Sequence, residues 1–411
     1  MRSDRISIQE FPCPDGQGRT GGRWKEKGFT SEDPQTEIHR AIGASASAQY
    51  DVLVVGTSPL SLLEAVTQAQ KGLRVCIVER DDRIGGAWKT EDCLDLKGIE
   101  TTPHVFIPEG GAYDVLDRYL ASNFRTLDLK PCLLVKRRGW FFRDSSIPLE
   151  NRMRIGLALA LALHWDGKTH GVAKRLLKSA GLVSRRLHEI LRQPLAQTAK
   201  YPEGGLTKWF DSVLDILKDR GVHLFLNSKV KNISKLNGLV RVRLDGGRDL
   251  YALQVALNKH IQLDGADEYG KPIPVECRGK VSNHYTFVVA DAMPRGFVHA
   301  VGHSDIRLIN DVSDYSPGLD DLYPGCRLIT LRTNAYVNRH KAEPDVYFTA
   351  LKTMGYLPQQ SRLIRYHHRE IADKKLTKAT MATLKRIMGP SVKFLVTHDL
   401  GIMSTIARTY G

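Results

Sequence analysis

Hydrophobic positions between residues 50 and 80 follow two spacings, one typical of buried strands and one typical of an amphipathic helix. Val52–Val55 and Val75–Val78 are short apolar runs rich in β-branched residues, as expected for strands buried on both faces. Between them, Ser61–Gln70 carries an apolar stripe at helical spacing, made of Leu62, Leu63, Ala65, Val66 and Ala69. Gly72 stands just past the last turn of that helix. The pattern predicts a strand–helix–strand unit.

The turns of this unit have the features of a dinucleotide site. Gly56 ends the first strand, and Glu79 follows the second, where a dinucleotide fold places the acid that bonds a ribose hydroxyl. Amides at a helix start bind phosphate because they are unpaired and carry partial positive charge. The candidate binding residues are Gly56, Ser58, Pro59, Leu60, Ser61 and Glu79. Because serines occupy two of the three usual glycine positions, a structural unit without a ligand stays open as the alternative.

Further along the chain, the periodicity predicts helices at Ala112–Leu120 and Thr207–Arg220 and a hairpin over residues 133–142. Strands are expected at residues 223–227, 229–233, 239–244 and 250–257. A β-rich region follows, with strands expected at residues 285–289, 296–301, 326–331 and 346–350. The last of these can also be read as the start of a helix over residues 347–354, and a Lys-rich helix ends near Met388.

The residues after Glu79 carry a family resemblance. The run Val-Glu-Arg-x-x-x-Ile-Gly-Gly-x-x-x-Thr, ending at Thr90, resembles the second FAD signature of the amine oxidase, protoporphyrinogen oxidase and phytoene desaturase flavoproteins. In that family the paired glycines let the backbone pass close to the flavin. The resemblance adds these residues to the candidate FAD site: Arg80, Gly85, Gly86, Ala87 and Trp88.

Two later blocks are similar to the same family. Residues 201–227 look like the return to the FAD domain, and residues 389–401 look like its last strand and closing turn. The resemblance implies that Val230 and Asp399 also contact the cofactor. It implies an α/β fold, with a Rossmann-like FAD-binding domain of the glutathione-reductase type and an inserted α+β substrate domain built on an antiparallel sheet.

This resemblance also predicts domain boundaries. The expected FAD domain is discontinuous, over residues 49–110, 196–262 and 386–411. Residues 111–195 form the helical part of the substrate domain, and residues 263–385 its β-rich part. Residues 1–48 are polar and glycine-rich, so they are expected to be a flexible extension.

Composition narrows the class of protein. The chain has 411 residues, 42% hydrophobic and 26% charged, which is ordinary for a globular protein. Its net charge of +15 favours anionic partners, but no zinc-ligand spacing or RNP-like aromatic block accompanies it, so neither a metal nor nucleic acid is expected. The six cysteines form no CxxC pair and suit a reducing compartment. The first ten residues have no apolar signal region. A cytoplasmic location is therefore expected.

Residues 155–192 raise a second possibility for location. Residues 155–163 are apolar but shorter than the roughly 20 residues that a membrane span needs. Residues 168–192 are strongly basic with interleaved leucines. A buried helix followed by a solvated helical face is one interpretation, and peripheral contact with an acidic membrane is the other.

The function expected from the resemblance is an FAD-dependent oxidoreductase of the amine oxidase and desaturase type, acting on an anionic or lipid-like small molecule. No catalytic residue is assigned, although four side chains fall near the expected pocket: His104, Tyr285, His299 and His367. A shorter resemblance to Rab escort and GDP-dissociation inhibitor proteins, in Gly56–Ser61 and Gly85–Trp88, gives a binding protein without redox activity as the alternative. A non-redox flavoenzyme of the sugar-mutase type is the third reading.

Overall fold

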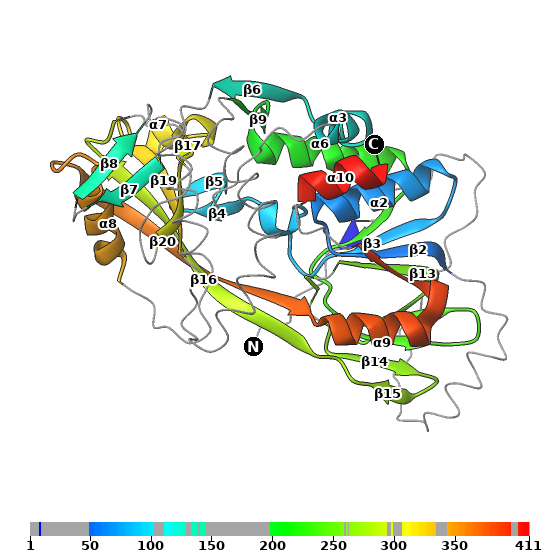
Figure 1. Ribbon diagram of the computed structural model, residues 1–411. Coiled ribbons are helices and arrows are strands. Elements are labelled where there is room, and N and C mark those ends of the chain that lie inside the picture. Colours follow the sequence, from blue (N-terminus) through cyan, green and yellow to red (C-terminus); the bar gives the residue numbers. More distant parts are fainter. Residues whose placement is uncertain are drawn as a thin grey trace.

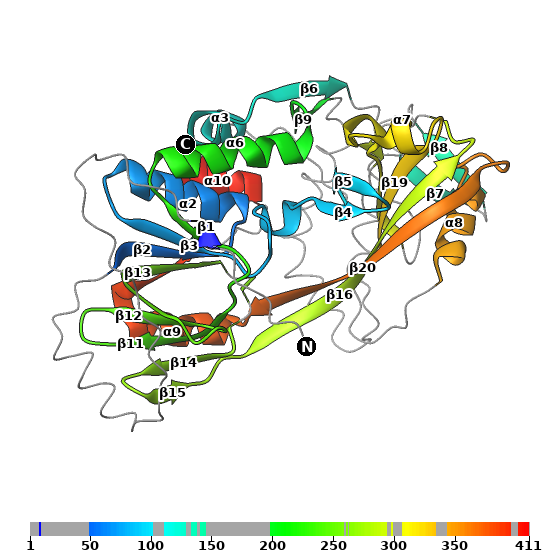
Figure 2. The same ribbon diagram turned by 180° about the vertical axis from the view of Figure 1, so that it is seen from behind.

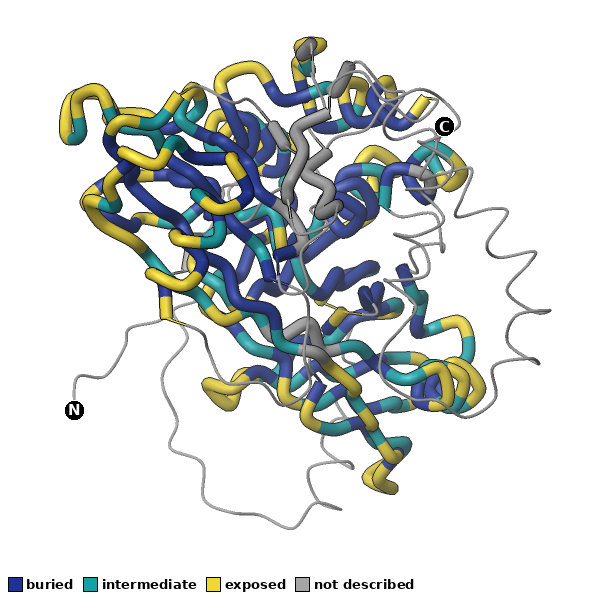
Figure 3. The backbone as a smooth tube through the Cα atoms, turned by 60° about the vertical axis from the view of Figure 1, so that its left-hand side comes forward, coloured by how far each residue is buried: buried dark blue, intermediate teal, exposed yellow. Residues whose placement is uncertain are grey.

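The computed structural model has a mixed α/β fold with two main sheets (Figure 1). It describes residues 8–9, 49–101, 111–128, 133–137, 140–144, 198–258, 260–261, 263–293, 297–298, 306–333, 343–395 and 402–410. Buried strands lie inside the molecule, and the exposed residues gather at turns and helix ends (Figure 3).

Parallel strands form the centre of the larger sheet. They are β10 (His223–Phe225), β3 (Val75–Val78), β2 (Tyr50–Val55), β13 (Asp249–Asn258) and β21 (Val392–Leu395). β2 pairs with β3 on one side and β13 on the other, and β21 pairs with the end of β13. All four residues of β3 are buried, as its continuous apolar run predicts.

The rest of this sheet extends from both sides of the parallel strands. Next to β13 come β12 (Val240–Leu244), β11 (Val230–Lys235), β14 (Gly265–Glu268) and β15 (Lys271–Ile273). The sequence grouped β14 and β15 with the β-rich substrate region, but their hydrogen bonds join them to this sheet. At the other edge, β1 (Ile8–Gln9) pairs antiparallel with β10, inside the segment expected to be a flexible extension.

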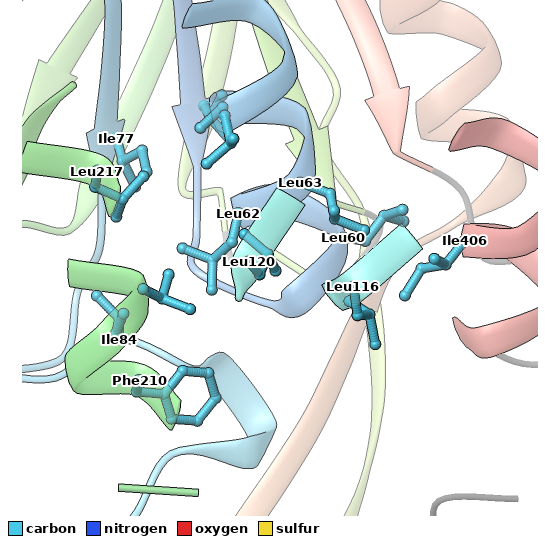
Figure 4. Close-up of a cluster of buried hydrophobic side chains, with 14 of the residues drawn as sticks. Leu60, Leu62, Leu63, Ile77, Ile84, Leu116, Leu120, Phe210, Leu217 and Ile406 are labelled. Atoms are coloured by element: carbon cyan, nitrogen blue, oxygen red, sulfur yellow. The ribbon is translucent and has the colours of Figure 1, made fainter. Parts of the chain in front are cut away.

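Helices cover both faces of the larger sheet (Figures 1 and 2). One face carries α2 (Pro59–Gln70), α3 (Ala112–Leu120), α6 (Gly205–Asp219) and α10 (Ile402–Tyr410). Figure 4 shows Leu60 of α2 near Leu116 of α3 and Ile406 of α10. The other face carries α9 (Lys378–Met388), whose Leu384 and Met388 are buried against it. The amphipathic patterns therefore form two apolar layers with the sheet between them.

The second sheet is antiparallel and comes from one stretch of chain. Its order is β17 (Phe297–Val298), β18 (Ile306–Asp311), β19 (Arg327–Thr333), β16 (Cys277–Ala290) and β20 (Arg362–Leu376). One face packs against α8 (Pro344–Thr353).

The strand expected at residues 346–350 is wrong, because these residues lie within α8. Pro344 starts the helix at a position where its missing N–H is not needed, and Asp345 lies in the first turn. The alternative of a helix here is correct.

Small strand pairs and short helices complete the fold. The pairs are β4 (Glu91–Cys93) with β5 (Leu96–Ile99), β6 (Phe124–Asp128) with β9 (Thr198–Pro202), and β7 (Leu133–Arg137) with β8 (Trp140–Asp144). The β7–β8 pair is the hairpin predicted at residues 133–142. The short helices are η1 (Gly86–Trp88), η2 (Ser313–Tyr315), α7 (Leu319–Leu322) and η3 (Gly389–Ser391).

The segment considered for membrane contact, residues 155–192, lies outside the described residues. In the part of the chain that the structure describes, no helix combines the length and apolarity needed to cross a bilayer.

Candidate functional site

The predicted dinucleotide residues meet where parallel strands of the larger sheet end. Gly56 follows β2, Glu79 follows β3, and Asn258 is the last residue of β13. The amide of Gly56 donates to the carbonyl oxygen of Val78 over 2.8 Å, which holds the first two turns together. Ligands of α/β sheets bind outside the carboxyl ends of such strands.

Glu79 links these turns through its side chain. Its Oε2 accepts hydrogen bonds from the amide (2.9 Å) and the hydroxyl of Thr57, and its Oε1 accepts from the amide of Asp81 at 3.0 Å. The side chain is only 5% exposed. Burial raises the pKa of Glu79, and the hydrogen bonds from Thr57 and Asp81 partly oppose that rise. A carboxylate has about four acceptor positions, so three such bonds leave one for a ribose hydroxyl.

Thr57 is a site residue that the sequence analysis did not single out. Besides its bonds to Glu79, its carbonyl oxygen (3.2 Å) and hydroxyl oxygen (3.1 Å) both accept from the amide of Gly85. Thr57 therefore joins the turn after β2, the acid after β3 and the paired glycines. The available signal was a hydroxyl residue directly after the turn glycine.

The start of α2 combines satisfied and unsatisfied donors. The Ser58 hydroxyl oxygen accepts from the amide of Ser61 at 3.3 Å and from Nδ2 of Asn258 at 3.0 Å. Two donors fill both of its lone pairs, so its own proton is directed to another acceptor, either Ser61 Oγ at 3.0 Å or a ligand. Pro59 has no N–H to offer. Among the described residues, the amides of Ser58 and Leu60 have no partner.

These donors and acceptors fit an adenosine diphosphate group. Two unpaired amides and the Ser58 hydroxyl stand at the positive end of a 12-residue helix, where phosphate binds favourably. Glu79 keeps one acceptor position of the kind that a ribose hydroxyl requires. Asn258, at the end of β13, positions the Ser58 hydroxyl through its hydrogen bond.

The paired glycines are required by packing inside the chain. Gly85 has φ +115°, and a Cβ added there would lie 2.7 Å from the ring of Phe210. Gly86 has φ +60°, and its added Cβ would lie 3.2 Å from the backbone of Ser58. The second signature thus packs directly on the start of α2, with no side chain between the two backbones.

The neighbours of these glycines lie in different environments. Trp88 packs against Trp209 of α6, with ring centroids 6.0 Å apart. Ala87 is exposed. Arg80 is also exposed, and its Nε lies 3.7 Å from a carboxylate oxygen of Asp81. Arg80 and Ala87 therefore lie on the surface beside the site.

The structure places Val230 close to the same site. Val230 is buried at the start of β11, and two residues earlier the amide of Ser228 donates to the carbonyl oxygen of Glu79 at 2.8 Å. This segment therefore reaches the same corner as the candidate ribose acid. Asp399, His104 and His299 lie outside the described residues.

A second polar centre joins the β4–β5 hairpin to the second sheet. Glu91 of β4 pairs with Arg369 of β20, and its oxygens lie 3.8 Å from Nζ of Lys89 and 3.8 Å from Nε2 of His367. Burial alone would raise the pKa of Glu91, but the nearby His367 ring and the charges of Arg369 and Lys89 lower it overall. The lowered pKa keeps the Glu91 carboxylate ionised at neutral pH.

Tyr285 and His367, two of the candidates near the pocket, lie on opposite faces of the second sheet. Tyr285 stands opposite His368, whereas His367 stands opposite Thr286, and neighbouring residues of a strand point to opposite faces. Tyr285 is buried with Tyr347 of α8, and burial raises the pKa of its hydroxyl. It belongs to an apolar core, whereas His367 belongs to the Glu91 centre.

Comparison with known proteins gives a likeness of fold. No protein-family model and no curated protein sequence matches the chain. A putrescine oxidase variant superimposes with a TM-score of 0.57 at 15% identity, covering 88% of this chain and 98% of that one. Cyclohexylamine oxidase from Brevibacterium oxydans gives a TM-score of 0.54 at 16% identity, covering 87% of this chain and 96% of that one. A candidate protoporphyrinogen oxidase from Exiguobacterium sp. gives a TM-score of 0.57 at 13% identity, covering 88% of this chain and 97% of that one. The chain therefore has the fold of these amine oxidase-like proteins, as the resemblance in its sequence predicted.

Proposed function

We propose that the chain binds FAD in a Rossmann-like domain and is an oxidoreductase acting on an organic small molecule held by an inserted substrate domain. The observation that carries the proposal is the Thr57–Glu79–Gly85 hydrogen-bond network, which joins three turns at the carboxyl ends of parallel strands. The fold shared with amine oxidase-like proteins supports the same reading.

In this proposal each residue of the site has a role of its own. Glu79 accepts a ribose hydroxyl, while the amides of Ser58 and Leu60 and the Ser58 hydroxyl donate to phosphate oxygens. Asn258 holds that hydroxyl in position. Bound FAD would supply hydride-accepting chemistry, and the protein would supply binding and orientation.

The test begins with the visible spectrum of the purified full-length protein before and after incubation with FAD. Flavin absorption bands in the near ultraviolet and the blue are expected, and anaerobic bleaching by candidate substrates would establish redox turnover. Thr57→Val removes one hydroxyl donor to Glu79, so FAD affinity should fall about tenfold. Thr67→Val is the matched control, because the Thr67 hydroxyl donates to the carbonyl oxygen of Leu63 within α2. A folded protein that neither carries nor takes up FAD at micromolar concentration contradicts the proposal.

A binding protein without redox activity is the second candidate, favoured by a specific observation. Pro59 removes one amide from the start of α2 and Ser58 caps another, so fewer donors face a phosphate than in a three-glycine turn. The packing of Gly85 and Gly86 also explains these glycines without a flavin. A protein that stays colourless in FAD would favour this candidate, and the next measurement would be a search for protein or lipid partners.

A further inference from the structure

Lys89 stands between two acids at the end of the paired-glycine segment. Its Nζ lies 3.1 Å from a carboxylate oxygen of Asp81 and 3.8 Å from one of Glu91. The lysine side chain is only 11% exposed, and those of Asp81 and Glu91 are 25% and 20% exposed. Because little water screens these charges, they act on one another more strongly than charges on an open surface. Lys89 is therefore a largely buried cation beside the candidate FAD site.

Asp81 is held close to the candidate ribose acid. Its amide donates to Oε1 of Glu79, and its carbonyl oxygen accepts from the amide of Asn227, each over 3.0 Å. Like charges held close together disfavour ionisation, so a cation that pairs with Asp81 relieves its effect on Glu79. Arg80 also lies 3.7 Å from Asp81, but its side chain is 57% exposed and more strongly screened by water. Lys89 is the better placed of the two cations.

The ionisation of Glu79 matters for the binding of a nucleotide. Burial raises the pKa of Glu79, and so does the charge of Asp81, while hydrogen bonds from Thr57 and from the Asp81 amide lower it. A ribose hydroxyl donates a stronger hydrogen bond to an ionised carboxylate than to a protonated one. Within the described residues, the segments around this turn carry these charged side chains: Arg80, Asp81, Asp82, Lys89, Lys229 and Arg248.

The second acid beside Lys89 already has another partner. Glu91 pairs with Arg369 of β20 and lies 3.8 Å from Nε2 of His367. Since these basic side chains of the second sheet balance Glu91, the charge of Lys89 is left to balance Asp81, the nearer of its two acids. Four side chains thus alternate in charge from the turn after β3 to the second sheet: Asp81, Lys89, Glu91 and Arg369.

We propose that Lys89 is a positioning residue of the nucleotide site, which balances the charge of Asp81 and so keeps Glu79 able to accept a ribose hydroxyl. Through Glu91 and Arg369, Lys89 also ties this site to the second sheet. The inference rests on the proposed function, because it concerns how the same site holds its nucleotide. Removing the charge of Lys89 leaves Asp81 unbalanced, so Glu79 takes up a proton at a higher pH.

The experiment measures ligand affinity between pH 5 and pH 8 by calorimetric titration of the full-length protein at constant ionic strength. The ligands are FAD and ADP-ribose, which share the adenosine and a pyrophosphate diester that keeps its charge over this pH range. The affinity of the unaltered protein should fall as the pH falls, because Glu79 becomes protonated. Lys89→Met should move the midpoint of this fall upward by about one pH unit, which weakens binding up to about tenfold below the midpoint.

Matched variants separate charge from packing. Lys89→Arg keeps the charge and should keep the original pH profile, whereas Lys71→Met, at an exposed position after α2, should leave affinity unchanged. Asp81→Asn combined with Lys89→Met removes both charges and retains the Asp81 amide, so the midpoint should return to its original value.

A second pair of variants tests the tie to the second sheet. Arg369→Gln should move the midpoint upward by less than Lys89→Met does, because Glu91 then draws Lys89 away from Asp81. Arg278→Gln removes the same charge from a side chain that is 80% exposed on β16 and should have no effect. An unchanged midpoint in the Arg369→Gln variant overturns the tie to the second sheet.

The outcomes separate this inference from the proposed function. FAD uptake with the same pH profile in the Lys89→Met variant overturns the inference alone, and so does a loss of affinity that is equal at every pH, because that is the result of a purely structural role. ADP-ribose binding with the shifted midpoint, by a protein that takes up no FAD, overturns the proposed function alone. A protein that binds neither ligand overturns both.

Discussion

Replacing Lys393 with Met should destabilise the protein strongly, because among the described residues Lys393 is the cation that bonds the buried carboxylate of Glu64. Glu64 of α2 is 0% exposed. Its two oxygens accept hydrogen bonds from Lys393 Nζ at 2.7 and 2.8 Å, from the Tyr410 hydroxyl at 2.7 Å and from Gln68 Nε2 at 2.8 Å. Methionine keeps most of the length of the lysine side chain and removes both hydrogen bonds and the charge.

The magnitude follows from the geometry. Breaking a buried ion pair costs about 3–5 kcal/mol, since the remaining charge stays buried without its partner. The Lys393 side chain is 39% exposed, so water screens the pair and the lower end of that range, about 3 kcal/mol, applies. The double variant Glu64→Gln/Lys393→Met leaves no buried charge and should recover most of the loss.

The pH dependence gives an independent check. Burial raises the pKa of Glu64, but hydrogen bonds from Lys393, Tyr410 and Gln68 outweigh it and hold the pKa below its ordinary value. The native protein therefore keeps this stabilisation above about pH 4.3 and loses it only at lower pH. In the Lys393→Met variant burial dominates, the pKa of Glu64 rises, and folding takes up a proton. The difference in stability between the two proteins should then shrink between pH 8 and pH 5.

Urea unfolding followed by tryptophan fluorescence, at pH 7.5 and pH 5.5, measures these differences for the four proteins of the cycle. A loss below about 0.5 kcal/mol for Lys393→Met, within the range of ordinary surface substitutions, would refute the reasoning. So would a loss that is the same at both pH values.

Other predictions concern separate parts of the fold. Gly85→Ala should lower the melting temperature of the flavin-free protein, because alanine is strained at φ +115° and its Cβ would meet the ring of Phe210. Adding Phe210→Leu should restore part of the lost melting temperature, and no recovery would argue against the clash. Tyr201→Phe should cost about 1.5–3 kcal/mol in urea unfolding, because the Tyr201 hydroxyl donates to the buried carboxylate of Glu100; a neutral effect would contradict this. Burial raises the pKa of the Cys76 thiol, so iodoacetamide at pH 8 should modify it only after denaturation, as peptide mass spectrometry would show.

Patterns within short stretches predicted the local structure well. The strand at Val75–Val78 and the helix at Ala112–Leu120 have the predicted bounds. The first is a continuous apolar run buried on both faces, and the second has an apolar stripe that packs on one face of the sheet. The turn at Gly56 and the acid at Glu79 were also found where local spacing placed them.

Contacts between residues far apart in the chain could not be predicted from the sequence. The Asn258–Ser58 hydrogen bond spans 200 residues, and the Glu91–Arg369 pair depends on how a hairpin meets a different sheet. The sequence allowed both a strand and a helix at α8, because short apolar runs fit both periods and tertiary packing decides between them.

The strand pair β16–β20 has a consequence for how the protein could be divided. All strands of the second sheet lie between Cys277 and Leu376, and Val281 stands directly opposite Ala372. Removing the chain between these two residues would leave Val281 and Ala372 paired on neighbouring antiparallel strands. A two-residue turn such as Asn-Gly can connect such a pair. The segment that forms the second sheet could therefore be exchanged between proteins of this fold by joining the chain at this one pair of residues.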